Sequence, residues 1–141
     1  MHPSDLATSD TAPRLHAVHV QLVEEDPVGR ALLLRILDDY GATVTSCITT
    51  EEALAGFSAE HSDLVIGSSG TPEPDGNVFI RRLRLLEDNS ISTTPAAALT
   101  VMTHPEDRHR ALLAGFQAHL ARPVDPLELM AVLASLVGRN Q

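Results

Sequence analysis

The chain has 141 residues, 43% of them apolar, and a formal net charge of −9. This suits one globular domain and argues against non-specific nucleic-acid binding, which needs clustered positive charge. No apolar run approaches the length of a membrane helix, Met1–Arg14 lacks the apolar core of a signal peptide, and the single cysteine, Cys47, excludes a disulfide framework. We therefore expect a cytoplasmic protein that contacts neither membrane nor nucleic acid.

The sequence pattern predicts a flexible tail over residues 1–15, one domain over residues 16–138 and a short tail over residues 139–141. Five apolar or β-branched segments predict strands: Ala17–Val23, Thr43–Ile48, Leu64–Ile66, Ala96–Val101 and Gln117–Ala121. A helical segment follows each of them. Alternating strands and helices imply an α/β fold, with a parallel sheet covered on both faces.

The predicted helices are marked by the residues that begin and end them. Three starts combine a capping side chain with a proline or a glutamate: Asp26 with Pro27, Thr49 with Glu52, and Asp125 with Pro126. The third helix is predicted from about Asn77 to Leu86, and the fourth opens with Thr103, Pro105 and Glu106. Glycines end the first, fourth and fifth helices, at Gly41, Gly115 and Gly138.

Polar side chains follow the strands at their carboxyl ends, where open α/β sheets bind ligands. They are Glu24, Glu25 and Asp26 after the first strand, Ser68 and Ser69 after the third, Thr100 after the fourth and Arg122 after the fifth. Clustered acids that face a hydroxyl and a cation are typical of a Mg²⁺ and phosphoryl site. Alternatively, Ser68 and Ser69 have no chemical role and are only small residues where the backbone packs closely.

Four segments, in order, resemble signature segments of the receiver domains of bacterial two-component signalling: Leu22–Pro27, Pro72–Gly76, Ala98–Thr100 and Ala114–Pro126. The last is most similar to receivers of hybrid histidine kinases. The resemblance implies a five-stranded, flavodoxin-like parallel sheet with strand order 2-1-3-4-5. It also implies a non-enzymatic signalling role, a histidine kinase or an effector protein as partner, and a cis Arg122–Pro123 bond.

The chain departs from the family pattern at the centre of the site. Ser68 stands where the family has its phosphoaccepting aspartate, and Arg122 stands where it has lysine. Glu24 and Glu25 replace an aspartate-rich pair. The switch hydroxyl is kept as Thr100, and His119 falls at the switch position that is aromatic or histidine in the family.

These departures predict a pseudo-receiver that works through protein–protein interaction without aspartyl phosphorylation. We expect no cofactor; if Mg²⁺ did bind, the resemblance would assign it to Glu24, Glu25 and Gly70. Arginine pairs carboxylates through its planar fork. We therefore predict that Arg122 bridges Glu24 or Glu25 in place of the ion.

Two other functions remain open. The vacated site could bind a phosphate-bearing small ligand between Ser68, Ser69, Thr100 and Arg122. Alternatively, Ser68 could itself accept a phosphoryl group, with a nearby glutamate as base.

The surface offers further candidates. A homodimer is expected through the fourth helix, the fifth strand and the fifth helix, with four apolar residues as candidates: Leu112, Leu113, Leu129 and Val132. Arg81, Arg82 and Arg84 are interpreted as a solvated helix face. His16 and His19 are interpreted as residues of the tail junction and of an edge-like segment, and not as metal ligands.

Overall fold

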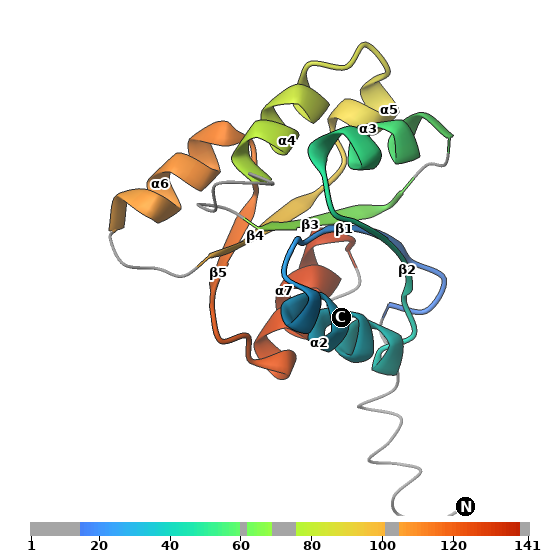
Figure 1. Cartoon of the computed structure of the whole chain (residues 1–141), viewed down its shortest axis with the longest axis vertical. Helices are drawn as coiled ribbons and strands as arrows, with labels where there is room; N and C mark the ends of the chain where they lie inside the picture. Colours follow the sequence, from blue (N-terminus) through green and yellow to red (C-terminus); the bar gives the residue numbers. More distant parts are fainter. Residues whose placement is uncertain (1–14, 60–61, 69–75, 101–104, 139–141) are drawn as a thin grey trace, which may run out of the picture.

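The structure is a computed structural model that describes residues 15–59, 62–68, 76–100 and 105–138. At its centre lies a five-stranded parallel sheet with the order β2-β1-β3-β4-β5 (Figure 1). The strands are β1 (His19–Val23), β2 (Thr43–Cys47), β3 (Leu64–Ser68), β4 (Ala96–Thr100) and β5 (Ala118–Ala121). This confirms the predicted fold class and the strand order that the receiver resemblance implied.

Helices cover both faces of the sheet, because each crossover between parallel strands places its helix on one side. The helices are α2 (Pro27–Asp39), α3 (Thr50–Ala59), α4 (Gly76–Arg84), α5 (Asn89–Ser92), α6 (Pro105–Ala114) and α7 (Pro126–Leu136). Figure 1 shows α2 and α7 on one face, and α3, α4 and α6 on the other. Within the described ranges, no helix has the length and apolarity needed to cross a membrane.

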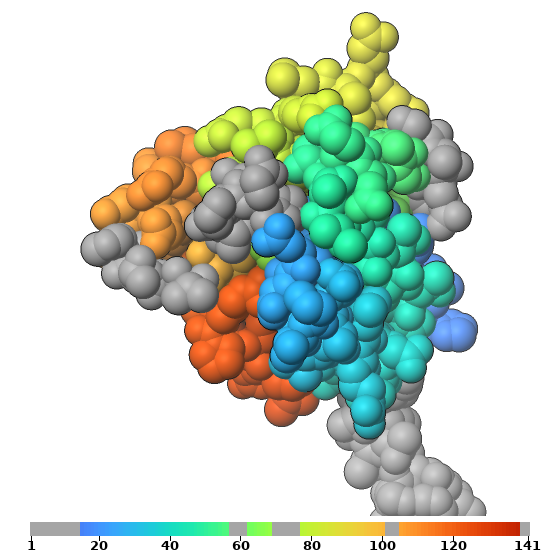
Figure 2. All heavy atoms as spheres, in the orientation of Figure 1, coloured from blue at the N-terminus to red at the C-terminus, as the bar shows by residue number. Residues whose placement is uncertain are grey.

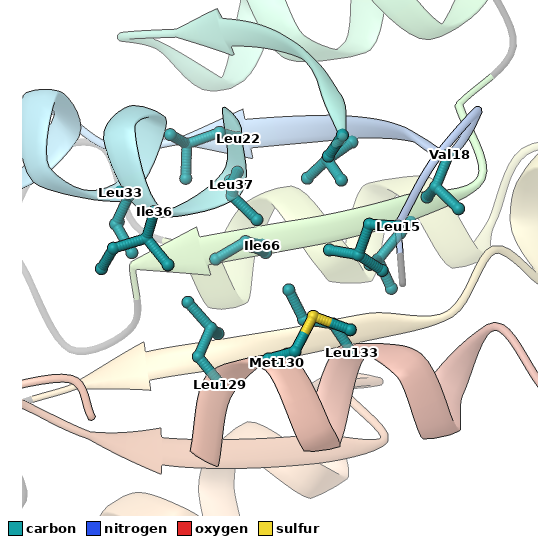
Figure 3. Packing of buried hydrophobic residues seen from close by; sticks show 14 of the residues in the cluster. Leu15, Val18, Leu22, Leu33, Ile36, Leu37, Ile66, Leu129, Met130 and Leu133 are labelled. Carbon is teal, nitrogen blue, oxygen red and sulfur yellow. The ribbon is translucent and has the colours of Figure 1, made fainter. Parts of the chain in front are cut away.

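Two apolar clusters fill the space between the sheet and its helices, one on each face. The cluster under α2 and α7 joins Leu22 and Ile66 of the strands to Leu33, Leu129 and Leu133 of the helices (Figure 3). β3 and β4 are buried along their whole length, because each has helices above and below it. The polar ends of these strands therefore emerge from a rigid support.

The helix starts form as their sequences predict. Asp26 accepts a hydrogen bond from the backbone N–H of Gly29 at 2.8 Å, and Asp125 accepts one from Leu127 at 3.0 Å. Glu52 donates its backbone N–H to the Thr49 hydroxyl, while its carboxylate accepts the Thr49 N–H in return. These caps satisfy backbone donors that the first helical turn leaves free. Thr103, expected in the cap of α6, lies outside the described residues.

The region after α4 differs from the prediction. A short helix, α5, lies where the sequence suggested only a polar connection. Arg84 is half-buried and does not belong to a solvated face: its guanidinium donates to the carbonyl oxygens of Ser92, Thr94 and Gly115. Burial lowers the pKa of Arg84. The carbonyls at the ends of α5 and α6 stabilise the charge, as expected for a cation at helix C-termini.

Three smaller expectations are also corrected. Leu15, assigned to the flexible tail, is buried in the core, and its N–H donates to the Tyr40 carbonyl. His19 lies on β1, which is an inner strand of the sheet. Leu129, a candidate for an interaction surface, is fully buried. The rest of the expected tails, residues 1–14 and 139–141, lies outside the described residues.

Candidate functional site

The carboxyl edge of the sheet brings together residues that are distant in sequence. Glu24 directly follows β1, Ser68 ends β3, and Arg122 directly follows β5. Parallel strands end at the same edge, so the three side chains converge over the middle of the sheet. The site is therefore built by the topology and not by any one segment.

The three side chains form one closed cluster. The Arg122 guanidinium makes an ion pair with Glu24 through Nη2 and Oε1. The same Nη2 donates a hydrogen bond to Ser68 Oγ at 2.8 Å, and Ser68 Oγ donates to Glu24 Oε1 at 2.7 Å. Of the two acids named as partners for Arg122, the structure selects Glu24. The bridge expected from the sequence is confirmed.

The burial of Glu24 makes its contacts with Arg122 and Ser68 important for stability. Glu24 and Ser68 are each 3% exposed, and the Arg122 side chain is 23% exposed. The other Glu24 oxygen, Oε2, accepts the backbone N–H of Asp26 at 3.1 Å. A buried carboxylate is tolerated only when it is paired and hydrogen-bonded. Arg122, Ser68 and the Asp26 N–H supply these partners from within the chain.

Gly29 was not identified from the sequence, yet it lies against this cluster. A Cβ added at this position would come within 3.5 Å of Arg122 Nη1, 3.6 Å of Glu24 Oε1 and 3.0 Å of Asp26 Oδ2. The missing side chain thus leaves room beside the guanidinium. A glycine in the first turn of a helix was the available signal, because glycine is unfavourable there without a packing reason.

Fewer acids belong to the site than the sequence predicted. Glu25 and Asp26 are both exposed, and Asp26 is engaged as the cap of α2. Arg30, which the sequence analysis did not single out, donates to the backbone carbonyl oxygens of Glu24 and Glu25 at 2.9 and 3.1 Å. Among these acids, the described contacts place only the Glu24 carboxylate in the cluster with Ser68.

The two expected switch residues lie on neighbouring strands. Thr100 is buried at the end of β4, and its carbonyl oxygen accepts the backbone N–H of Arg122 at 2.9 Å. His119 lies on β5 opposite Ala98. Its Nε2 is buried and has no hydrogen-bond partner in the part of the chain that the structure describes. Burial is the main cause that lowers the pKa of His119, and the nearby Arg108 lowers it further.

The remaining predicted features are only partly described. Ser69, Gly70 and the loop through Asp75 lie outside the described residues, so the expected contributions of Ser69 and Gly70 are not placed. The Arg122–Pro123 peptide bond is cis, as the resemblance implied.

The Glu24 carboxylate, as it is held in this cluster, offers no free oxygen to a Mg²⁺ ion. Mg²⁺ requires near-octahedral oxygen ligands, at least one of them a carboxylate free to coordinate. Both Glu24 oxygens already accept hydrogen bonds, and Oε1 is also paired with Arg122 Nη2. In the described residues, no group of three or more His, Cys, Asp or Glu side chains could hold a metal ion.

Comparison with known proteins gives a consistent result. The response regulator receiver domain family matches residues 20–134. A 14.6 kDa protein in the sodA1 3′ region of Leptolyngbya boryana is 40% identical over 84% of this chain and 89% of its own length. The response regulator Rre1 of Synechocystis is 30% identical over 88% of this chain and 53% of its own length. The chain thus spans most of the first relative but only about half of the second.

Solved structures share the same fold. A putative response regulator from Chloroflexus aurantiacus superposes with a TM-score of 0.80, at 24% identity over 86% of this chain and 98% of that chain. The receiver domain of the yeast response regulator Ssk1, solved with the phosphotransfer protein Ypd1, gives a TM-score of 0.77 at 20% identity, over 86% and 89% of the two chains. At these identities the likeness concerns the fold.

Proposed function

The chain belongs to the response regulator receiver domain family of two-component signalling, and we propose that it is a pseudo-receiver, which signals by protein–protein interaction without aspartyl phosphorylation. The observation that carries this proposal is the closed cluster of Glu24, Ser68 and Arg122. In this cluster the guanidinium and the hydroxyl supply internally the contacts that a metal and a phosphoryl group would otherwise make.

Ser68 is poorly suited to replace an acyl-phosphate acceptor. Its hydroxyl must lose a proton to become a nucleophile, and the base within reach is Glu24. The ion pair with Arg122 draws on the same Glu24 oxygen, so Glu24 could act as a base only by giving up that pair. A serine phosphate would also be hydrolytically stable and would not reset like an acyl phosphate.

The contact between Ser68 Oγ and Glu24 Oε1, at 2.7 Å, nevertheless favours one second candidate, phosphorylation of Ser68 itself. The other alternative, a phosphate-bearing small ligand, has less support. Such a ligand would have to displace Glu24 from Arg122 and would meet the exposed carboxylates of Glu25 and Asp26. Phosphorylation of Ser68 is one of the outcomes that the experiment below distinguishes.

The surface of α2 supplies a docking face for a partner. Val28 and Leu32, one helical turn apart, are 76% and 53% exposed, and Leu127 at the start of α7 is 72% exposed. The two helices lie side by side on the surface (Figure 2). We assign this face to the helices of a histidine kinase or of a phosphotransfer protein, the partner class with which the Ssk1 receiver was solved.

A second face agrees with the homodimer or effector contact expected from the resemblance. On α6, Leu113 is 73% exposed and Leu112 is 38% exposed, while Val132 on α7 is only half-buried. Leu112, Leu113 and Val132 therefore remain candidates for the α6–β5–α7 face, whereas the buried Leu129 does not. A non-enzymatic role in the cytoplasm, without nucleic acid, completes the proposal.

Intact mass spectrometry tests the proposal directly. The natural protein, Ser68→Asp and the double variant Ser68→Asp/Arg122→Lys are incubated with Mg²⁺ and acetyl phosphate or phosphoramidate. We expect no adduct on the natural protein and one labile phosphoryl group on the double variant, because it regains both the acceptor and the family lysine. The double variant is the control for the integrity of the scaffold.

The alternative outcomes are distinct. A stable adduct on the natural protein that disappears in Ser68→Ala would replace the pseudo-receiver proposal by serine phosphorylation. A labile adduct on the natural protein would contradict both, since neither proposal provides an acyl phosphate. Peptide mapping would then locate the modified residue.

A further inference from the structure

β2 forms one edge of the sheet, so some of its backbone N–H and C=O groups point away from the sheet. The N–H of Thr43 donates to the carbonyl oxygen of Val18 at 2.9 Å, so Thr43 faces β1. In a parallel strand, the N–H and C=O of one residue point to the same side and alternate along the chain. The N–H and C=O groups of Val44 and Ser46 therefore point outward from the sheet.

The chemistry of this edge is unusual for an exposed strand. From Thr43 to Ile48 the sequence is Thr-Val-Thr-Ser-Cys-Ile, with no charged residue and no proline. Natural proteins usually protect exposed edges with charges, prolines or bulges. The opposite edge, β5, runs directly into Arg122 and Pro123. In a chain with a net charge of −9, β2 thus offers an uncharged strip along which two copies could meet.

A groove lies beside β2 on the α2 face. It has a volume of about 380 Å³ and is lined by Leu34, Arg35, Asp38, Ala42 and Val44. Its lining is mixed: Ala42 is buried and both Leu34 and Val44 pack against the core cluster of that face, while Arg35 and Asp38 are exposed. The two charged residues belong to the outer side of α2.

Ile48 lies beyond the other end of the same strand and is 45% exposed. Side chains alternate between the two faces of a strand. Ile48 lies in the bend directly after Cys47, and its N–H donates to Glu52 Oε1 at 2.9 Å; we place its side chain on the α2 face, as for Val44 and Ser46. An exposed apolar side chain and a groove partly lined by Leu34 and Val44 therefore lie at opposite ends of one edge.

From this arrangement we propose that the β2 edge is a dimerisation surface, on which a second copy of the chain pairs antiparallel about a two-fold axis through Thr45. In this register Val44 lies opposite Ser46 of the second copy, and their outward N–H and C=O groups form the hydrogen-bonded pairs of an antiparallel ladder. The two Thr45 residues face each other directly. The two sheets continue as one.

The same register brings Ile48 opposite Ala42 of the second copy. Each Ile48 side chain then enters the groove beside α2 of its partner, and the two-fold axis repeats this contact. One arrangement thus satisfies both the backbone pairing and the side-chain contact. The strand is short, so the interface is small, and the dimer forms weakly and depends on protein concentration.

Sedimentation velocity of the full chain, from micromolar to millimolar concentration, tests the proposal. We expect a reversible dimer whose dissociation constant rises at least about tenfold in Ile48→Asp, which places a carboxylate in the groove, and in Ser46→Lys, which charges the edge. Leu85→Asp, at a residue that is 82% exposed just after α4, is the matched control and leaves the dimer unchanged, whereas Leu113→Asp tests the α6–β5–α7 face as the rival interface. Circular dichroism confirms that each variant is folded.

A chain that stays monomeric at millimolar concentration would overturn the proposal. So would a dimer that Leu113→Asp abolishes and Ile48→Asp leaves intact, because association would then use the α6–β5–α7 face. Neither result bears on the pseudo-receiver proposal, which rests on the separate cluster at Arg122.

Disulfide trapping checks the register without relying on loss of binding. In a non-hydrogen-bonded antiparallel pair, the two Thr45 Cα atoms would lie about 4.5 Å apart, within the range that a disulfide bridges. We expect Thr45→Cys to form a covalent dimer on mild oxidation. Ser46→Cys, whose copies would lie roughly 7–8 Å apart on the diagonal, should crosslink much less.

The native Cys47 is buried, so the natural chain controls for background crosslinking. Equal crosslinking of Thr45→Cys and Ser46→Cys, or none in either, would contradict the pairing. This readout also remains available if Ile48→Asp does not fold.

Discussion

Two buried polar clusters on β1 show how differently one strand can satisfy polar side chains. At its carboxyl end, Glu24 is held by Arg122 and Ser68 through an ion pair and hydrogen bonds. In its middle, Gln21 is held by neutral contacts: its amide donates to the Ala53 carbonyl at 3.1 Å and to Cys47 Sγ at 3.2 Å. Both glutamine and glutamate are almost fully buried.

The neutral cluster continues toward the amino edge of the sheet. The Ser62 hydroxyl donates to Gln21 Oε1 at 3.4 Å, and His19 Nε2 lies 2.7 Å from Thr45 Oγ1. None of these contacts depends on one buried charge cancelling another. The charged cluster should therefore be sensitive to the loss of any member, whereas the neutral cluster should lose one contact at a time.

The largest effect is expected for Arg122→Met. This change leaves Glu24 buried without its cation, and we expect it to lower the free energy of unfolding by about 3 kcal/mol. Urea denaturation measures the loss. The double variant Glu24→Gln/Arg122→Met is the control, and it should lose clearly less because the buried charge is gone. A single-variant loss no larger than that of the double variant would refute the idea of a coupled charged cluster.

A smaller effect is expected for Gln21→Leu in the neutral cluster. The substitution keeps the volume approximately and removes the amide that joins Ala53 and Ser62, at an expected cost of about 1–2 kcal/mol. The same urea measurement applies. A loss equal to that of Arg122→Met would mean that charge does not distinguish the two clusters.

The two glycines beside the clusters sharpen the comparison further. An alanine Cβ at Gly56 would lie 2.9 Å from Gln21 Nε2, which is fixed by its hydrogen bonds. Gly56→Ala should therefore destabilise by about 1 kcal/mol, despite the higher helix propensity of alanine. Gly29→Ala presses on the Asp26 carboxylate that caps α2, so a weakened cap offsets the higher helix propensity of alanine and we expect a change near zero. Thermal unfolding of both variants checks the contrast, and the reverse order would contradict it.

The smallest effect concerns His119, a half-buried polar group outside both clusters. Burial lowers its pKa below the ordinary value of 6.5. A lowered pKa means that the folded state favours the neutral ring, so this stability is complete above pH 6.5 and is lost as the pH falls toward the folded-state pKa. Urea midpoints at several pH values should fall less steeply on acidification in His119→Gln than in the natural chain. Parallel curves would show that His119 contributes nothing to the pH dependence.

Much of the fold follows from local sequence signals. The strand segments, the caps at Asp26, Thr49 and Asp125, and the glycine at the end of α2 each act within a few residues, and each was identified correctly. The sheet order and the identity of Arg122 as a site residue came from the receiver resemblance together with the strand-end rule. The ion pair between Arg122 and Glu24 was predictable because two opposite charges were left without their usual partners.

Other features depend on contacts between segments that no local pattern connects. Arg84 was read as a surface residue because its own helix has a charged face, yet its partners are carbonyls at the ends of α5 and α6. Gly29 lies beside Arg122, although Arg122 follows β5 at the opposite edge of the sheet. The sequence spacing of Leu129 in its helix did not show whether the side chain faces the core or a partner. The packing of α7 against the sheet buries it in the core.

The sequence by itself thus determined the fold class, the positions of most elements and the set of residues at the carboxyl edge, because periodicity, caps and turns are properties of short segments. Tertiary structure alone decided which acid pairs with Arg122, which arginine is buried and which strand edge carries both a groove and an exposed Ile48. These outcomes depend on distances between residues far apart in the chain, and such distances are set only when the sheet closes and its helices pack.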